Sequence, residues 1–191
     1  MQKFARLAVI SAIAMGGNAL AAEGVSHTWV EAGYGYTEVA GGAADGDGFA
    51  LGGSIELPSN FVLAAGYQDF DIENEARLKD ISAGVGYKFA LTDAFDIVAG
   101  ASFERIELED EGESGFGLSL AARTRVTDQL ELSAGLKYQD IKELPSTFSA
   151  SLGGRWYFTP AFAGGVEVRK GDFVVGASET RFVATLRYDF A

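Results

Sequence analysis

Few residues in this chain have the types and spacing that catalysis needs. The sequence holds one histidine, His27, and no cysteine, which excludes thiolate metal sites, cysteine nucleophiles and disulfides. It also lacks the Gly-x-Ser-x-Gly elbow of a serine nucleophile. Carboxylates alone can act as general acid and base, but the acidic residues are scattered along the chain. We therefore expect no enzyme, no catalytic residue, no cofactor and no resident metal.

A second set of charged residues alternates with glycine and serine, so that these charges share one face of the predicted strands. An unpaired charge is costly to bury, so we expect these side chains to pair across neighbouring strands or to stay hydrated. A structural plug of ion pairs is the favoured interpretation, and a charge-lined path for small solutes or ions is the alternative. The set comprises Glu31, Glu56, Lys88, Asp96, Glu104, Arg123, Arg125, Glu131, Lys137, Arg155, Glu167, Arg169, Arg181 and Arg187.

The elements that must position these residues are strands. Apolar residues alternate with small or polar ones, and this period of two is typical of strands with two unlike faces. Short turns with one pattern, apolar, turn, apolar, recur at a spacing that holds one hairpin each, at residues 57–61, 91–95, 126–130 and 158–162. The pattern predicts about ten strands, at residues 28–38, 48–57, 61–70, 79–90, 95–106, 115–126, 130–139, 147–158, 162–169 and 179–190.

Residue size indicates which face points inward. One face carries glycine and serine, as at Gly33, Gly84 and Ser102, whereas a solvated surface would carry Lys, Glu and Thr. Small side chains suit a narrow lumen. The other face is apolar, with aromatic residues such as Tyr34 and Tyr138 toward the strand ends, as in the girdles of membrane barrels.

These observations predict an all-β fold, namely a transmembrane antiparallel up-and-down β-barrel. Inside a membrane no water is present to pair with backbone N–H and C=O groups, so all of them must pair within the sheet and the sheet has to close. The count is about ten strands, with eight as the alternative should two weak strands be miscounted. His27 then lies at the start of the first strand, near the periplasmic edge and far from the surface loops.

The N-terminus has the features of a cleavable signal peptide. Lys3 and Arg6 form a positive start, residues 7–15 are apolar, and residues 19–21 fit a small-residue cleavage site. The apolar stretch is too short for a spanning helix, which needs roughly 20 residues. We expect export to a Gram-negative outer membrane, and vesicles shed from it are a further location. The predicted domains are a signal peptide over 1–22 and a barrel over 23–191.

The longer connections are predicted at the cell-surface end and are acidic. The net charge of the chain is −12, which makes nucleic acid an unsuitable partner. Acidic loops would repel the phosphates of lipopolysaccharide unless divalent cations bridge them. Residues 44–48, ADGDG, are similar to a fragment of a calcium loop but lack its later ligands, so a flexible acidic turn is favoured. The predicted loops are residues 39–47, 71–77, 107–114, 140–146 and 170–178.

Three functions follow from this organisation. The first is a non-enzymatic envelope protein of the outer membrane, structural or a narrow porin-like channel. The second is an adhesion, host-interaction or signalling-related protein that acts through its acidic loops, since recognition commonly uses loops on a rigid scaffold. The third, least favoured, is an outer-membrane enzyme. The sequence does not specify an oligomeric state.

Several short motifs resemble a known family. They are AEGVS at 22–26, VEAGY at 30–34, GGAADG at 41–46 and GGS at 52–54, and they are similar to small outer-membrane β-barrel proteins of gammaproteobacteria. Members of that family were formerly described as secreted quorum-sensing or immune-eliciting proteins, so the resemblance implies a barrel and a link to signalling. The last strand, ending at Phe190, looks like the signal read by the barrel-assembly machinery, although Ala191 follows the terminal aromatic residue.

Overall fold

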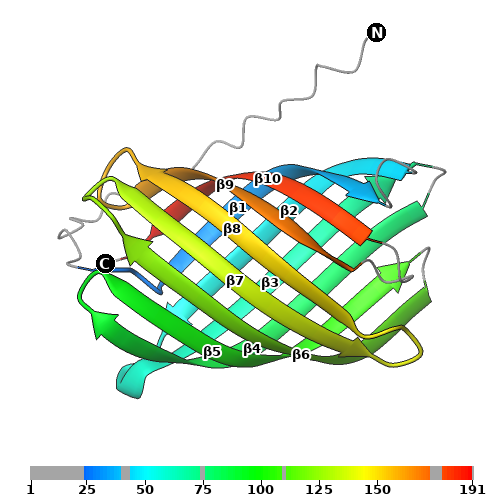
Figure 1. The fold of residues 1–191 in the computed structure, drawn as a ribbon, viewed down its shortest axis with the longest axis horizontal. Coiled ribbons are helices and arrows are strands. Elements are labelled where there is room, and N and C mark those ends of the chain that lie inside the picture. Colours follow the sequence, from blue (N-terminus) through cyan, green and yellow to red (C-terminus); the bar gives the residue numbers. More distant parts are fainter. Residues whose placement is uncertain (1–23, 40–43, 74–75, 109–110, 173–177, 191) are drawn as a thin grey trace, which may run out of the picture.

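A computed structural model of the chain describes residues 24–39, 44–73, 76–108, 111–172 and 178–190. Within them, ten antiparallel strands close into one barrel (Figure 1). Each strand pairs with its neighbours in chain order, and β10 (Ser178–Asp189) pairs with β1 (Trp29–Val39) to close the sheet. The predicted up-and-down barrel of ten strands is confirmed, and the alternative of eight strands is excluded.

The other strands are β2 (Ala44–Glu56), β3 (Phe61–Ile72), β4 (Ala76–Thr92), β5 (Phe95–Leu108), β6 (Glu111–Arg125), β7 (Leu130–Ile141), β8 (Thr147–Tyr157) and β9 (Phe162–Asp172). One short 3-10 turn, Pro58–Asn60, joins β2 to β3. In the described part of the chain, no helix is long and apolar enough to cross a membrane. The predicted signal peptide lies outside the described residues.

Two of the tight turns, 126–130 and 158–162, close in the same way because they repeat the same residue pattern. The backbone N–H of Val126 donates to the carbonyl of Leu130 over 2.8 Å, and the N–H of Phe158 donates to the carbonyl of Phe162 over 2.9 Å. A threonine hydroxyl then accepts the returning N–H, as when Thr127 Oγ1 accepts from Leu130 over 3.0 Å. Such side-chain bonds to the backbone favour turns over continued strand. The apolar, turn, apolar pattern therefore fixes the hairpins at the end where the chain terminates.

The opposite end differs from the prediction. β2 begins at Ala44, not at residue 48, and β6 begins at Glu111, not at residue 115. Most described residues of the predicted acidic loops are thus strand, except for residues 73 and 142–146. Asp45 and Asp47 are ladder residues, so the favoured flexible turn at 44–48 is wrong, and so is a calcium-loop fragment. The reason is that backbone pairing continues above the apolar band, where the side chains no longer have to alternate for burial.

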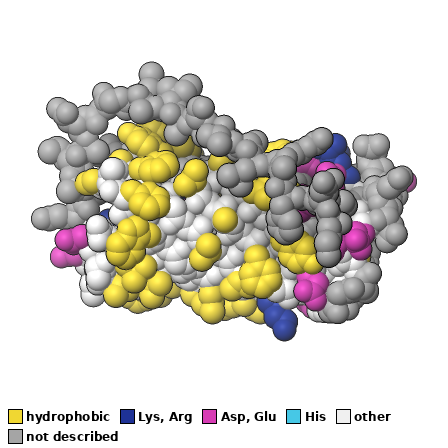
Figure 2. All heavy atoms as spheres, turned by 90° about the horizontal axis from the view of Figure 1, so that it is seen from above, with side chains coloured by type: hydrophobic (Ala, Val, Ile, Leu, Met, Phe, Trp, Pro, Cys, Tyr) yellow, Lys and Arg dark blue, Asp and Glu magenta, His cyan; other side chains and the backbone are white. Residues whose placement is uncertain are grey.

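The two faces of the wall have the predicted polarity. Tyr34 is 58% exposed and Leu152 is 64% exposed, both on the outer face, and Figure 2 shows hydrophobic side chains across the outer wall, with acidic side chains at its ends. The inner face carries small residues because neighbouring strands leave no room. A Cβ on Gly84 would lie 2.5 Å from the carbonyl oxygen of Ala101, well inside contact distance, so this position requires glycine.

Candidate functional site in the barrel lumen

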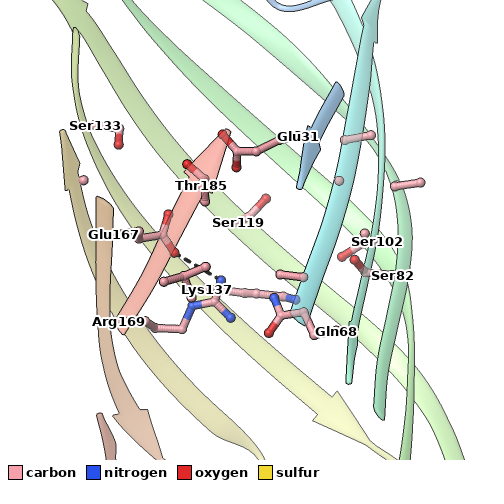
Figure 3. A pocket seen from close by; sticks show the side chains of 18 of the residues that line it. Glu31, Gln68, Ser82, Ser102, Ser119, Ser133, Lys137, Glu167, Arg169 and Thr185 are labelled. Carbon is pink, nitrogen blue, oxygen red and sulfur yellow. Dashed lines mark hydrogen bonds and ion pairs between the residues drawn. The ribbon is translucent and has the colours of Figure 1, made fainter. Parts of the chain in front are cut away.

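The lumen contains a cavity of about 360 Å³ in its central part. Its wall is built from inward positions of the strands, where glycine and serine alternate with the outward apolar residues. Ser82, Ser102, Ser119 and Thr185 project hydroxyl groups into it, and Lys137 crosses it from β7 (Figure 3). The cavity wall therefore combines these hydroxyl and charged groups with glycine, alanine and valine residues.

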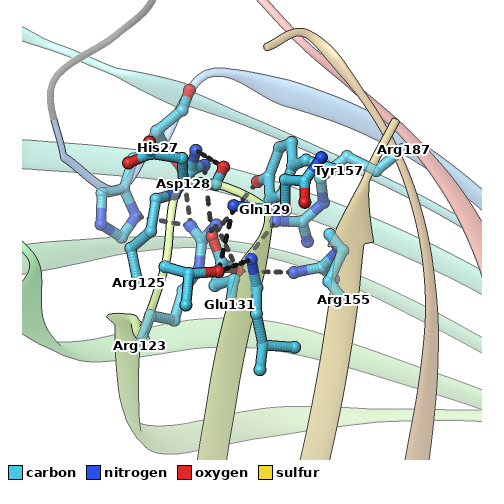
Figure 4. A network of polar contacts seen from close by, with 12 residues as sticks. His27, Arg123, Arg125, Asp128, Gln129, Glu131, Arg155, Tyr157 and Arg187 are labelled. Carbon is cyan, nitrogen blue, oxygen red and sulfur yellow. Dashed lines mark hydrogen bonds and ion pairs between the residues drawn. The ribbon is translucent and has the colours of Figure 1, made fainter. Parts of the chain in front are cut away.

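Glu131, on β7, is the centre of an ion network below this cavity, at the end of the tight turns (Figure 4). Its side chain is 0% exposed. Arg123 Nη2 donates to both carboxylate oxygens, over 2.9 and 3.0 Å, and Arg155 Nη1 donates to Oε1 over 2.6 Å. The hydroxyl of Tyr157 adds a contact of 3.2 Å. One buried carboxylate thus has several charge-assisted hydrogen bonds, which are the stronger kind.

Two further guanidinium groups surround the same carboxylate and stack on aromatic rings. Arg125 Nη2 lies 3.9 Å from Glu131, and its guanidinium carbon lies 4.0 Å from the centre of the Tyr157 ring. Arg187 Nη1 lies 4.0 Å from Glu131, and the Arg187 guanidinium lies 3.9 Å from the centre of the Trp29 ring. Cation–π stacking holds each guanidinium flat against the wall.

Glu31, on β1, ties the network across the lumen. Its Oε2 accepts from Arg155 Nη2 over 2.8 Å and from Arg187 Nε over 3.0 Å. β8, which carries Arg155, is separated from β1 by β9 and β10, so this contact spans the interior and does not follow the sheet. The network therefore narrows the lumen at this end.

His27 extends the same network from outside the sheet. Its side chain is buried, and Nε2 lies 2.7 Å from Asp96 Oδ2. Arg123 Nη1 lies 3.4 Å from His27 Nδ1. The structure has His27 at the tight-turn end of the barrel, before β1. The sequence gave no signal that its side chain enters the lumen, because it precedes the first strand.

The other predicted charges pair in smaller groups. Glu56 pairs with Lys88 at the same end. Further along the axis, Glu104 accepts from Lys137 Nζ over 3.0 Å, and Arg169 lies 3.4 Å from Glu167 on the same strand.

Arg181 lies toward the end opposite the tight turns and contacts residues that the sequence analysis did not single out. It pairs with Glu179 and Gln68 and stacks on Phe70 at 4.3 Å. Thr37 Oγ1 donates to the same Glu179 carboxylate over 2.8 Å. Glu179 and Tyr157 share the inward parity of the predicted set, so the alternation that identified the others could have found them.

The end opposite the tight turns is filled differently. Buried apolar side chains from five strands form a cluster inside the wall there, and partly buried ones from β2, β5 and the connection after β7 pack against it. Its members are Val39, Ile72, Leu78, Ile106 and Ile141, with Ala44, Leu108 and Leu144 packed against them. The lumen thus has three layers, namely an ion network, a central cavity and an apolar cluster. No group of acidic or histidine side chains suited to a metal occurs in the described ranges.

Comparison with known proteins gives the family and agrees with this architecture. The KdgM porin, solved with disordered oligogalacturonate, is 10% identical and has a TM-score of 0.50 over 85% of this chain and 99% of its own. An outer membrane channel from Pseudomonas putida F1 is 10% identical, with a TM-score of 0.52 over 87% and 96%. At such identity these structures share the fold alone. No curated protein sequence matches the chain. The model of the outer membrane protein beta-barrel domain matches residues 5–178, and the chain therefore belongs to that family of outer-membrane barrels.

Proposed function

We propose that this barrel is a non-enzymatic, narrow channel that passes small hydrophilic solutes across the outer membrane. The observation that supports the proposal is the central cavity, into which hydroxyl and charged groups project, within a wall whose outer face is apolar. A barrel that served only as scaffold could fill its interior with larger side chains, as many small barrels do.

The layers of the lumen also predict which solutes the channel selects and how much current it carries. A solute has to pass the network around Glu131, where cationic and anionic groups lie within about 3 Å of each other. Rings of charge set selectivity in pores, and constriction limits flux. We expect a small conductance, well below that of a general porin, because both ends of the cavity are narrowed.

A matched pair of substitutions on β6 tests this proposal. Ser119 lines the cavity, and its neighbour Leu118 is 51% exposed on the outer face. In planar bilayers, Ser119→Trp should reduce single-channel current, because the ring occupies the cavity, whereas Leu118→Trp should leave the current unchanged. Both variants are first checked for folding by heat-modifiable migration on a gel. A folded wild-type barrel without any current, or equal current in both variants, would refute the channel.

The route to the membrane is part of the proposal. A signal peptide over residues 1–22 and recognition of the strand that ends at Phe190 by the barrel-assembly machinery are consistent with an exported barrel. The mass of the mature protein, isolated from outer membranes and from shed vesicles, tests both. A chain that retains residues 1–22 would contradict cleavage.

A second candidate function, contact with a partner at the cell surface, is supported by the acidic outer rim. On the outer face Asp71 is 87% exposed at the end of β3, and the hydroxyl of Tyr36 donates to Asp45 over 2.8 Å on β2. Such a rim suits divalent cations that bridge it to lipopolysaccharide, or a host receptor, as the resemblance to immune-eliciting proteins implies. Loss of cell attachment in Asp45→Asn/Asp71→Asn, with unchanged bilayer current, would favour it over the channel.

A further inference from the structure

We propose that residues 24–28 form a strap that closes the periplasmic mouth of the channel, with the contact between His27 and Asp96 as its latch. The inference rests on the proposed channel function and concerns the regulation of that same lumen. The strap is defined as the five described residues that precede β1, whose ladder begins at Trp29.

The strap crosses the mouth from one wall to the opposite one. At its inner end, the hydroxyl of Thr28 accepts from the N–H of Glu56 over 3.1 Å, and the carbonyl of Thr28 accepts from Phe190 over 2.8 Å. Both partners belong to the wall beside β1. At its outer end, a Cβ on Gly24 would lie 2.7 Å from the carbonyl oxygen of Asp93, in the turn between β4 and β5. Because β5 and β6 lie across the barrel from β1 in the strand order, the strap spans the opening.

The middle of the strap is held by charged groups of the lumen. His27 is 4% exposed and lies between Asp96 of β5 and Arg123 of β6. Arg123 Nη1 donates to the carbonyl of Ser26 over 2.6 Å, while its other nitrogens bind Glu131. Arg123 thus links the strap to the ion network, so that closure and network support each other.

The strap can open at lower cost than the wall. A ladder residue in a closed barrel is bonded on both sides, and in a membrane it cannot exchange those bonds for water. Apart from the backbone bond from Phe190 to Thr28, the strap has no ladder bonds, and it lies at the aqueous end, so release of His27 and Ser26 exchanges side-chain contacts for water. Local opening of a segment held by a few side-chain contacts costs less free energy than opening of a strand that is paired on both sides. We therefore place the moving part of this channel at the strap.

Breaking the latch should raise conductance. Asp96→Asn keeps the shape of the side chain but removes the charge that faces His27, and His27→Ala removes the ring. Each should increase the open probability in planar bilayers several-fold over the wild type. Asp128→Asn is the matched control, because Asp128 is exposed in the turn after β6 and only its backbone carbonyl contacts Arg125. The control should conduct as the wild type does.

A cross-link then restores closure without the native contact. The chain has no cysteine, so His27→Cys/Asp96→Cys carries the only thiols. We expect this variant to conduct like His27→Ala. A short, reducible bis-thiosulfonate reagent should return the current to the wild-type level, and a reducing agent should release it again. Current that stays high after verified cross-linking would overturn the strap.

A readout that does not depend on current separates this proposal from the channel itself. In liposomes, Ser26→Cys is labelled with a charged, membrane-impermeant thiol reagent, with and without Asp96→Asn. Faster labelling in the double variant supports the strap, even if every variant fails to conduct and the channel proposal falls. Equal labelling and equal current in a conducting barrel overturns the strap alone. Each variant is first shown to fold by heat-modifiable migration, and His27→Ala serves if Asp96→Asn does not fold.

Discussion

The two ends of the lumen are narrowed by opposite chemistry. At the tight-turn end the interior is crowded with ion pairs around Glu131 and Glu31, and at the other end it is filled by apolar side chains such as Ile106 and Ile141. Buried charges attract strongly but require every partner, because desolvation is costly. Apolar packing is less directional and tolerates the loss of one member. The tight-turn end therefore behaves as a unit, and the apolar end as a sum of contacts.

This contrast also separates their roles. Charges select what passes, because they attract one sign and repel the other. An apolar constriction resists ions of either sign, since neither is solvated there. In the proposed channel, a hydrophilic solute that enters at the end opposite the tight turns meets the apolar cluster first, then the central cavity, then the ion network.

The largest expected effect is at Glu131. Glu131→Gln leaves Arg123 and Arg155 buried without their shared counter-charge, and removal of one partner from a buried pair costs roughly 3–5 kcal/mol. We expect a loss of unfolding free energy of that order in urea titrations of the barrel in lipid. Glu56→Gln is the control at the same end, because Glu56 has a single charged partner, Lys88. Equal losses in both variants would show that the network does not act as a unit.

The next effect is at the apolar end. Ile141 is 3% exposed within the cluster, and truncation of a buried isoleucine to alanine costs roughly 2–5 kcal/mol. We expect Ile141→Ala to lower the unfolding free energy by about 2 kcal/mol, the lower limit of that range, because the cluster is small and can relax. The same urea titrations measure it. Single-channel current should also rise, since the substitution widens the constriction. A loss larger than that of Glu131→Gln would reverse the comparison.

The sequence predicted one end of this barrel better than the other. The tight-turn ends agree to within about two residues, because the turn motif determines its own hydrogen bonds. At the opposite end the strands were predicted too short, as at β2 and β6. Strand pairing there continues through acidic and glycine residues that carry no apolar alternation.

The lumen shows the same division. Parity predicted that Arg155 and Glu31 face inward, because side chains alternate strictly along a strand. It did not predict that they pair across two intervening strands, since the tilt and radius of the barrel decide which inward groups meet. The position of the His27 side chain in the lumen could not be predicted for a related reason. Its position depends on the path of the strap across the mouth and not on any strand.

The smallest expected effect is at Glu167, between the two ends. Its side chain is 38% exposed, and it lies 3.4 Å from Arg169, so Glu167→Gln should change the unfolding free energy by only about 0–1 kcal/mol. Its effect on permeation should be larger than its effect on stability, because the freed Arg169 adds positive charge to the cavity wall. The reversal potential in a salt gradient should then shift toward anion preference, and the shift should shrink at high ionic strength as the charge is screened. An unchanged reversal potential would mean that permeating ions are selected only at the network around Glu131. The central cavity would then contribute nothing to ion selectivity.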